Sequence, residues 1–181
     1  MLQGARRAVG RFDAAVESRL DRRRGHRFLD RVMYGASELG DGSLVWHLVG
    51  LSQALLPGRE PLSVVRLSVI LGVESALVNG GIKQLFRRVR PEWISEDPRP
   101  HRLRQPRTSS FPSGHASAAF TAAGVLAAGG DPLWPVYYAI AVVVASSRAY
   151  VRIHHPSDVV AGAVLGVGLA LLANQVWPPI G

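Results

Sequence analysis

Three polar clusters in the sequence contain residue types that can bind and cleave a phosphate ester. The central cluster, Ser113-Gly114-His115, follows Pro112 and precedes an apolar run of small residues at 116–128. A proline and a capping serine before such a run are typical of the start of a helix. Because the first N–H groups of a helix attract anions, a phosphate there would meet backbone donors, a hydroxyl and an imidazole.

The other two clusters add cations and a histidine–aspartate pair. Lys83 and Arg90 are seven residues apart, which in a helix is two turns, so both side chains are expected to face one phosphate. Arg148 has a planar guanidinium that suits phosphate oxygens, and it is followed by His154 and Asp158. Phosphoester cleavage needs a nucleophile, an acid for the leaving oxygen and cationic donors, and the clusters offer a candidate for each.

Written as patterns, the clusters are K-x6-R-P at 83–91, P-S-G-H at 112–115 and S-R-x5-H-x3-D at 147–158. In this order they resemble the type 2 phosphatidic acid phosphatase (PAP2) superfamily. That family includes membrane lipid phosphatases, soluble bacterial acid phosphatases and vanadium haloperoxidases. The resemblance covers about residues 43–176, and the pattern is intact at every catalytic position.

The resemblance implies a role for each site residue. His154 is the expected nucleophile, which forms a phosphohistidine; Asp158, on the same face if the stretch is helical, would keep one imidazole nitrogen protonated. His115 is expected to protonate the leaving group and then to activate water. No metal or other cofactor is expected, because the surrounding cations do not suit a metal site. Phosphate binding is expected from Lys83, Arg90, Ser113, Gly114 and Arg148; singly, the three cations would be interpreted as residues that snorkel to the membrane interface.

Composition limits the class of protein and its partners. The 181 residues suit one domain, and the lack of cysteine excludes disulfides and thiolate metal sites. The net charge of +8 admits nucleic acid, an anionic membrane surface or a phosphorylated substrate as partner. We expect no nucleic-acid binding, because no module for it is recognisable in the sequence.

Residues 1–42 are predicted to form a basic amphipathic N-terminal arm. Nine arginines fall within 1–31, between apolar residues at partly helical spacing. This pattern favours a helix on an anionic membrane surface, with a solvated or disordered basic tail as the alternative. The arm lacks the apolar core of a signal peptide, and a turn is predicted at 37–42.

Residues 43–181 are predicted to form the phosphatase domain, an all-α bundle of about five transmembrane helices. The first expected span is short of the roughly 20 residues that a bilayer requires. If successive spans alternate in direction, all three clusters lie on one side of the membrane. The expected spans are 44–56, 62–85, 115–128, 133–146 and 159–177.

Several residues outside the clusters also receive an interpretation. Glu74 and Asn79 fall inside the second span, where interhelical hydrogen bonding is the preferred role and substrate gating the alternative. The G-x3-G motif at 162–166 is expected to pack the bundle internally. Arg87 and Arg88 are assigned to anionic lipid headgroups, and the Pro- and Arg-rich loop at 92–111 to recognition of the substrate headgroup. The histidines without a partner pattern, interpreted as structural, are His26, His47 and His101.

The sequence therefore predicts a multi-pass hydrolase of the cell membrane, a lipid phosphate phosphatase. The expected substrate is polyprenyl-linked, either a polyprenyl diphosphate or a polyprenyl-phosphoryl-ribose 5-phosphate of cell-wall biosynthesis. Phosphatidic acid or phosphatidylglycerophosphate, a soluble substrate of an acid phosphatase or haloperoxidase, and a non-catalytic scaffold are the alternatives. Nineteen of the 21 lysines and arginines lie on the site's side, which favours the cytoplasmic face and an external C-terminus. No oligomeric state is predicted.

Overall fold

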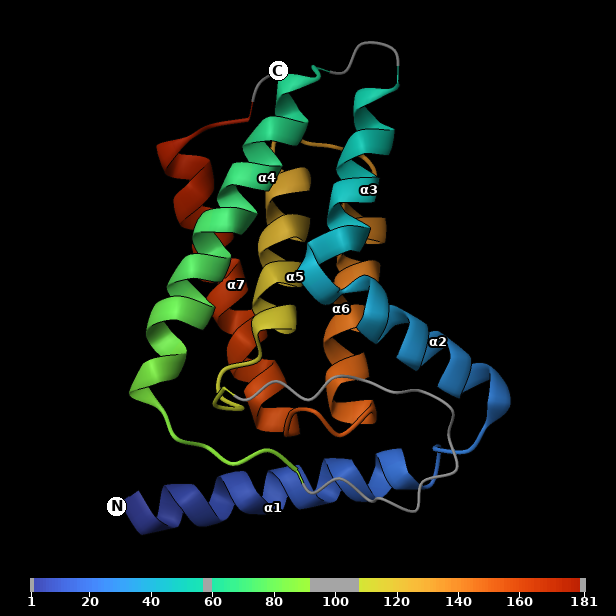
Figure 1. Cartoon of the computed structure of the whole chain (residues 1–181), viewed down its shortest axis with the longest axis vertical. Helices are drawn as coiled ribbons and strands as arrows, with labels where there is room; N and C mark the ends of the chain where they lie inside the picture. Colours follow the sequence, from blue (N-terminus) through green and yellow to red (C-terminus); the bar gives the residue numbers. More distant parts are fainter. Residues whose placement is uncertain (1, 57–59, 92–107, 180–181) are drawn as a thin grey trace.

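The computed structural model describes residues 2–56, 60–91 and 108–179, and within them all regular structure is helical (Figure 1). This confirms the predicted all-α class. The helices α3 to α7 run side by side along the long axis of the molecule, whereas α1 (Leu2–Asp21) lies across one end of this bundle and α2 (Arg27–Leu39) packs obliquely against α6. The bundle helices are α3 (Leu44–Ala54), α4 (Leu62–Ser75), α5 (Gly114–Leu126), α6 (Trp134–Tyr150) and α7 (Pro156–Val176).

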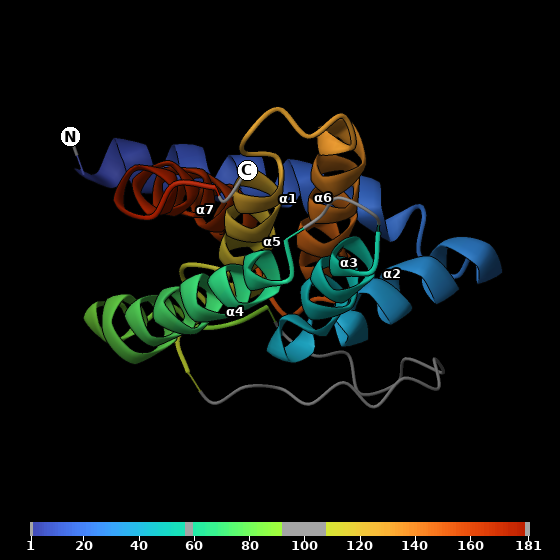
Figure 2. The same ribbon diagram turned by 90° about the horizontal axis from the view of Figure 1, so that it is seen from above.

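Helix α5 lies at the centre of the bundle, enclosed by α3, α4, α6 and α7 (Figure 2). Its alanines are buried because neighbouring backbones approach it closely. A Cβ added at Gly162 or Gly166 of α7 would collide with the carbonyl oxygens of Ser113 and Ser117, respectively. The glycines of the G-x3-G motif thus pack α7 against α5, which confirms the prediction of internal packing.

The second predicted span is a continuous helical run that changes its winding. Helix α4 passes into a π-helical segment, η2 (Ala76–Gly81), and then into a 3₁₀ segment, η3 (Ile82–Leu85). Gly80 and Gly81 disfavour regular α-helix at this point. The chain is extended at Phe86, so the expectation that Lys83 and Arg90 lie two turns apart on one helix is wrong.

Two helices meet the length and hydropathy required to cross a membrane. They are the run Leu62–Leu85 and helix α7, and only 28% and 17% of their apolar windows are buried inside the protein. The exposed apolar side chains on them, such as Val69, Val73 and Leu171, suit contact with lipid. Helices α3, α5 and α6 have 11, 13 and 17 residues, so the number of spans stays a prediction.

The N-terminal arm contains two helices where the sequence predicted one. Helix α1 (Leu2–Asp21) lies across the end of the bundle, and α2 (Arg27–Leu39) follows a turn with a positive φ at Gly25 (Figure 1). Asp13 of α1 is buried and accepts hydrogen bonds from the backbone N and Oγ of Ser157, at 2.8 and 2.9 Å. Helix α1 is thus docked on the bundle, contrary to the alternative of a solvated tail.

The turn predicted at 37–42 starts later than expected. Helix α2 continues to Leu39, and a short 3₁₀ segment, η1 (Asp41–Ser43), then connects it to α3. Gly42 and Ser43 have positive φ angles of 58° and 59°, which bend the chain between α2 and α3. This bend places Asp41 beside the start of α5.

Candidate active site

The three sequence clusters converge at the end of the bundle where α5 and α7 begin and α6 ends (Figure 1). A cavity of about 450 Å³ opens there. Of the eight residues predicted for the site, five line this cavity, namely Lys83, Gly114, His115, Arg148 and His154. The other three, Arg90, Ser113 and Asp158, contact the lining residues or the backbone that carries them.

His154 lies in the tight turn between α6 and α7. The backbone N–H groups of Ile153 and His154 both donate to the carbonyl of Arg148 at 3.1 Å, which fixes the turn. The imidazole is 2% exposed, and its Nδ1 lies 2.6 Å from the carbonyl oxygen of Ser110. Because a carbonyl only accepts, Nδ1 carries the proton and Nε2 keeps its lone pair.

The free nitrogen of His154 faces the cationic part of the site. Nε2 lies 3.4 Å from Nη1 of Arg90. Burial lowers the pKa of His154 to about 3, and the nearby charges of Arg90 and Arg148 act in the same direction. The imidazole is therefore neutral near pH 7, as a nitrogen nucleophile must be.

Asp158 supports the turn and does not bond the imidazole directly. Its Oδ2 is 3.8 Å from Nδ1 of His154, beyond hydrogen-bond distance, and accepts from the backbone N of His155 at 2.9 Å. Helix α7 begins at Pro156, so His154 lies outside it and the condition for a shared helix face is not met. The carbonyl of Ser110 takes the hydrogen bond predicted for Asp158, which contributes negative charge close to the ring.

Arg88 links this part of the site to helix α1. Its Nη1 donates to Oδ1 of Asp158 at 2.7 Å and to Oγ of Ser157 at 2.8 Å. Its Nη2 donates to Oδ2 of Asp13 at 2.7 Å. The assignment of Arg88 to lipid headgroups is therefore wrong, whereas Arg87 is exposed and stays a candidate for such contacts.

His115 has a carboxylate partner that sequence reasoning missed. In the first turn of α5, its Nε2 donates to Oδ1 of Asp41 at 2.8 Å. This hydrogen bond holds the pKa of Asp41 below its usual value. Gly40 leaves room for the ring, because a Cβ there would be 2.7 Å from Cδ2 of His115. The only signal in the sequence was an acidic residue in the turn expected on the same side of the bundle.

The cations are held in different ways. Arg148 is 2% exposed and donates through Nη1 to Ser37, while its Nε has no hydrogen-bond partner among the residues described. Arg90 donates to the carbonyls of Ile153 and Ser109 at 2.8 and 3.2 Å, so it ties two loops together beside His154. Lys83 is 7% exposed and lines the cavity. Three cations around one cavity suit a phosphate dianion.

Ser113 and Gly114 shape the start of α5 as predicted. Oγ of Ser113 accepts from the backbone N of Ala116 at 3.4 Å, so the serine is the N-cap. A Cβ on Gly114 would be 2.7 Å from Oδ1 of Asn79 and 3.4 Å from Nζ of Lys83. Only glycine therefore keeps the space between the helix N-terminus and the lysine open. In the described part of the chain, no three His, Asp or Glu side chains are grouped so as to hold a metal ion.

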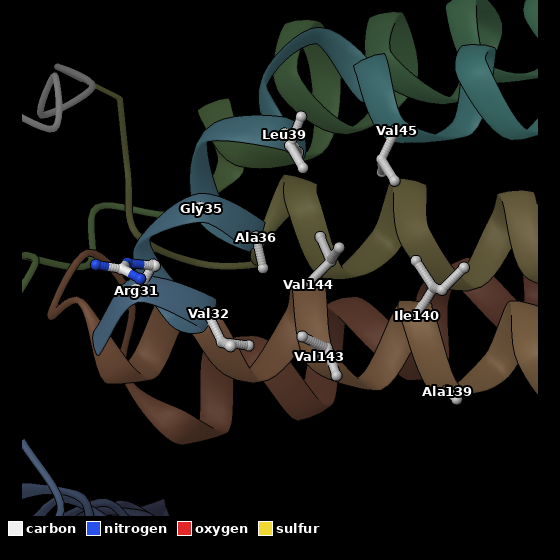
Figure 3. Close-up of a pocket in the computed structure, with 10 residues that line it drawn as sticks. All are labelled: Arg31, Val32, Gly35, Ala36, Leu39, Val45, Ala139, Ile140, Val143 and Val144. Atoms are coloured by element: carbon white, nitrogen blue, oxygen red, sulfur yellow. The ribbon is translucent and has the colours of Figure 1, made fainter. Parts of the chain in front are cut away.

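A second hollow, between α2, α3 and α6, is apolar (Figure 3). It has a volume of about 520 Å³, and apart from Arg31 its lining residues are aliphatic or glycine. In Figure 3 the aliphatic side chains of Val144 and Ile140 face this hollow from α6. It offers nothing for phosphate chemistry, so the polar cavity is the candidate active site.

The sequence model of the PAP2 superfamily matches residues 63–180. The chain therefore belongs to the PAP2 superfamily, as its three motifs predicted. The match includes all eight predicted site residues.

Curated relatives give more specific likenesses. The chain is 34% identical over 112 residues to an undecaprenyl-diphosphatase of Sulfolobus acidocaldarius, an alignment that covers 61% of this chain and 50% of the relative. It is 29% identical over 147 residues to a decaprenylphosphoryl-5-phosphoribose phosphatase of Mycobacterium tuberculosis, with 78% of this chain and 77% of the relative covered. The chain thus spans about half the length of the first relative and about three quarters of the second.

Solved structures share the fold. A transmembrane PAP2-type phosphatidylglycerolphosphate phosphatase from Bacillus subtilis superimposes with a TM-score of 0.70 at 26% identity, over 93% of this chain and 86% of that one. Aquifex aeolicus LpxE gives a TM-score of 0.70 at 24% identity, over 90% and 94% of the chains, which shows the common fold. With two apolar helices long enough to span a bilayer, these likenesses identify a membrane protein.

Proposed function

We propose that the protein is a membrane lipid phosphatase that removes a terminal phosphate from a polyprenyl-linked substrate through a phosphohistidine at His154. The observation that carries the proposal is the state of that histidine. It is buried and neutral, its Nδ1–H is held by a carbonyl, and its Nε2 lies beside Arg90 at the edge of a cavity lined by cations.

In the first step, the lone pair of Nε2 on His154 attacks phosphorus and the bond from phosphorus to the leaving oxygen breaks. Lys83, Arg90 and Arg148 stabilise the charge that spreads over the phosphoryl oxygens. The imidazole becomes positively charged, and the carboxylate of Asp158 at 3.8 Å stabilises that charge.

His115 moves the proton in both steps. Its Nε2–H is held by Asp41, so His115 enters the first step protonated on both nitrogens and gives the Nδ1 proton to the leaving oxygen. In the second step the same nitrogen takes a proton from water, whose oxygen attacks the phosphorus. The bond from phosphorus to Nε2 of His154 then breaks, and inorganic phosphate leaves.

The substrate class rests on the relatives. Both curated relatives carry names that specify polyprenyl-linked phosphates, which supports a polyprenyl diphosphate or a polyprenyl-phosphoryl pentose phosphate. Phosphatidylglycerophosphate is the second candidate, favoured by the structural likeness to the Bacillus subtilis enzyme. Most of the loop assigned to headgroup recognition, 92–107, lies outside the described residues.

We also propose five spans with the site on the cytoplasmic face. The position of α1 supports this orientation, because its exposed arginines lie at the site's end of the bundle, where an anionic leaflet would attract them (Figure 1). A reporter fused after Gly181 tests it. The proposal expects an external C-terminus, and a cytoplasmic reporter would overturn it.

The activity is tested by phosphate release from the purified protein in detergent with EDTA. The substrates are a polyprenyl diphosphate, a polyprenyl-phosphoryl pentose phosphate, phosphatidylglycerophosphate, phosphatidic acid and a soluble aryl phosphate. We expect release from a polyprenyl-linked substrate that is lost in His154→Ala. Turnover of the aryl phosphate alone would overturn the lipid assignment, and full activity of His154→Ala would overturn the mechanism.

A further inference from the structure

The active-site cavity extends beyond the residues that bind phosphate. Its inner wall is formed by polar side chains of α3, α4 and the π-helical segment η2, elements that also carry exposed apolar side chains. Polar groups within such apolar helices of a membrane protein are costly and mark functional sites. The inner-wall residues are His47, Ser68, Glu74, Ser75 and Asn79.

Glu74 has a buried oxygen that the protein does not satisfy. The residue is 2% exposed, and its Oε1 has no hydrogen-bond partner within residues 2–56, 60–91 and 108–179. Oγ of Ser117 on α5 is in the same condition. Ser117 is the neighbour of the Glu74 carboxyl across the α4–α5 contact, as the expected interhelical role requires, but Oε1 has no partner at hydrogen-bond distance in the described part, and a ligand hydroxyl would supply one.

The other polar groups of the inner wall are held in place. Nδ1 of His47 lies 3.2 Å from Oγ of Ser68 and joins α3 to α4. Asn79 bonds within its own helix, from Nδ2 to Oγ of Ser75 at 3.1 Å, and its Oδ1 lies against Gly114. Oxygen acceptors of known orientation therefore continue from the phosphate-binding helix end towards Glu74.

The cavity thus has two compartments of different chemistry. Cations and a helix N-terminus surround the position of the phosphate, whereas a carboxylate, an amide oxygen and hydroxyls line the inner wall. A second phosphate in the inner compartment would meet no lysine or arginine among the residues that line it. A neutral group that carries hydroxyls would instead donate to these acceptors.

We propose that the inner wall at His47, Ser68, Glu74 and Asn79 binds a hydroxyl-bearing group, a sugar or a polyol, esterified to the phosphate that is removed. This inference rests on the proposed function and makes the site selective for such phosphates over lipid diphosphates. A pentose and a glycerol headgroup share the required chemistry, and the substrates of the test distinguish them.

Two variants alter the inner wall in different ways. Glu74→Gln keeps the size of the side chain and removes the carboxylate. Gly72→Leu adds a side chain where a Cβ would have no atom within 4 Å, at a position that lines the cavity. The matched control is Gly168→Leu on α7, where the added Cβ also meets nothing within 4 Å and does not line the cavity. Leucine favours the helix over glycine at both positions.

The readout is kcat/KM for a polyprenyl-phosphoryl pentose phosphate, phosphatidylglycerophosphate and a polyprenyl diphosphate. We expect Glu74→Gln and Gly72→Leu to lower kcat/KM for a hydroxyl-bearing substrate by about tenfold or more, mainly through KM. The value for the diphosphate should stay within about twofold, which also verifies folding. Gly168→Leu should change neither. A response of the pentose substrate alone identifies a sugar site, and an equal response of phosphatidylglycerophosphate identifies a site for a polyol.

Equal losses on all substrates would overturn the inference, since they indicate a general structural role for Glu74. Unchanged kinetics in both variants would overturn it as well. In either case a wild-type protein that releases phosphate from any of these lipids leaves the proposed function standing. If the wild-type protein releases none, the proposed function fails.

Discussion

Two buried arginines at opposite ends of the bundle differ in how their hydrogen-bond donors are satisfied. Arg66, 3% exposed, donates to the carbonyl of Trp177 at 2.8 Å and to Oδ1 of Asn174 at 2.7 Å, and so fastens the end of α7 to α4. Arg148, 2% exposed, has its Nη1 on Ser37 and lines the cavity, with no partner in the described chain for its Nε.

The difference separates an arginine that serves the fold from one that, as we propose, serves the reaction. The bonds of Arg66 replace water for two donors and fix one helix end. Arg148 lies beside other cations, and its Nε–H has no partner in the described chain. This arrangement is electrostatically unfavourable until an anion binds. Burial of an arginine alone therefore does not indicate a functional site. An unpaired N–H donor that faces a cavity is the feature that distinguishes Arg148 from Arg66.

The largest expected effect separates these two roles. Arg148→Ala should lower kcat/KM by about 10²–10³, because a donor to the transition-state oxygens is lost. Arg66→Ala should leave kcat within about threefold and lower the free energy of unfolding by about 1–3 kcal/mol, because the groups it satisfied lose their partner. Phosphate release measures the kinetic constants, and thermal unfolding in detergent measures stability. A loss of activity in Arg66→Ala together with unchanged activity in Arg148→Ala would contradict the comparison.

A packing change tests the scaffold without touching a charge. In Gly166→Ala the new Cβ meets the carbonyl of Ser117 and Cβ of Phe120, so α5 and α7 must separate. We expect a loss of about 1–3 kcal/mol of stability. Gly168→Ala, where the Cβ meets nothing within 4 Å, is the control and should unfold at the wild-type temperature or above it. Equal melting temperatures for the two variants would contradict the packing of α7 on α5.

Arg88 and Arg87 form a further matched pair. Arg88 bonds Asp158 and Asp13, whereas its neighbour Arg87 is exposed. Arg88→Gln should lower kcat about tenfold with KM little changed, because the turn that holds His154 loses its support while phosphate binding remains. Arg87→Gln should leave kcat unchanged. A rise in KM alone for Arg88→Gln would instead assign Arg88 to substrate binding.

The pH dependence of His154 gives the smallest signal. Burial lowers its pKa to about 3, so the folded protein holds this ring neutral where the unfolded chain, with an ordinary pKa near 6.5, takes up a proton. Its contribution to stability is therefore complete above about pH 6.5 and is lost as the pH falls towards 3. In a histidine NMR titration, the signal that disappears in His154→Ala should not shift between pH 7 and 4.5. A midpoint near 6.5 would refute the buried, neutral state.

The helices and the residues that gather around the polar cavity could be predicted from the sequence because both have local signals. Ser113 was recognisable as an N-cap, and the apolar runs predicted α3, α5, α6 and α7 to within a few residues. The π-helical and 3₁₀ segments before Phe86 have no comparable pattern, so the helical spacing of Lys83 and Arg90 was misjudged.

What sequence reasoning missed depends on contacts between distant segments. The carbonyl of Ser110 that fixes the tautomer of His154 is a backbone group, and no residue type signals it. Asp41 lies 74 residues from His115, and the sequence places it only in a turn on the same side of the bundle, with no pattern that pairs the two. Arg88 could not be told from Arg87 until the fold placed Asp158 and Asp13 beside only one of them.

The most direct test of the account is the site of phosphorylation during turnover. The purified protein is mixed with substrate carrying a labelled terminal phosphate and quenched in alkali, and the phosphopeptide is mapped by mass spectrometry. Because Nδ1 donates to Ser110, the account predicts an acid-labile phosphoryl group on Nε2 of His154, absent in His154→Ala. A phosphoryl group on Nδ1, on another residue, or on no residue during steady turnover would contradict it.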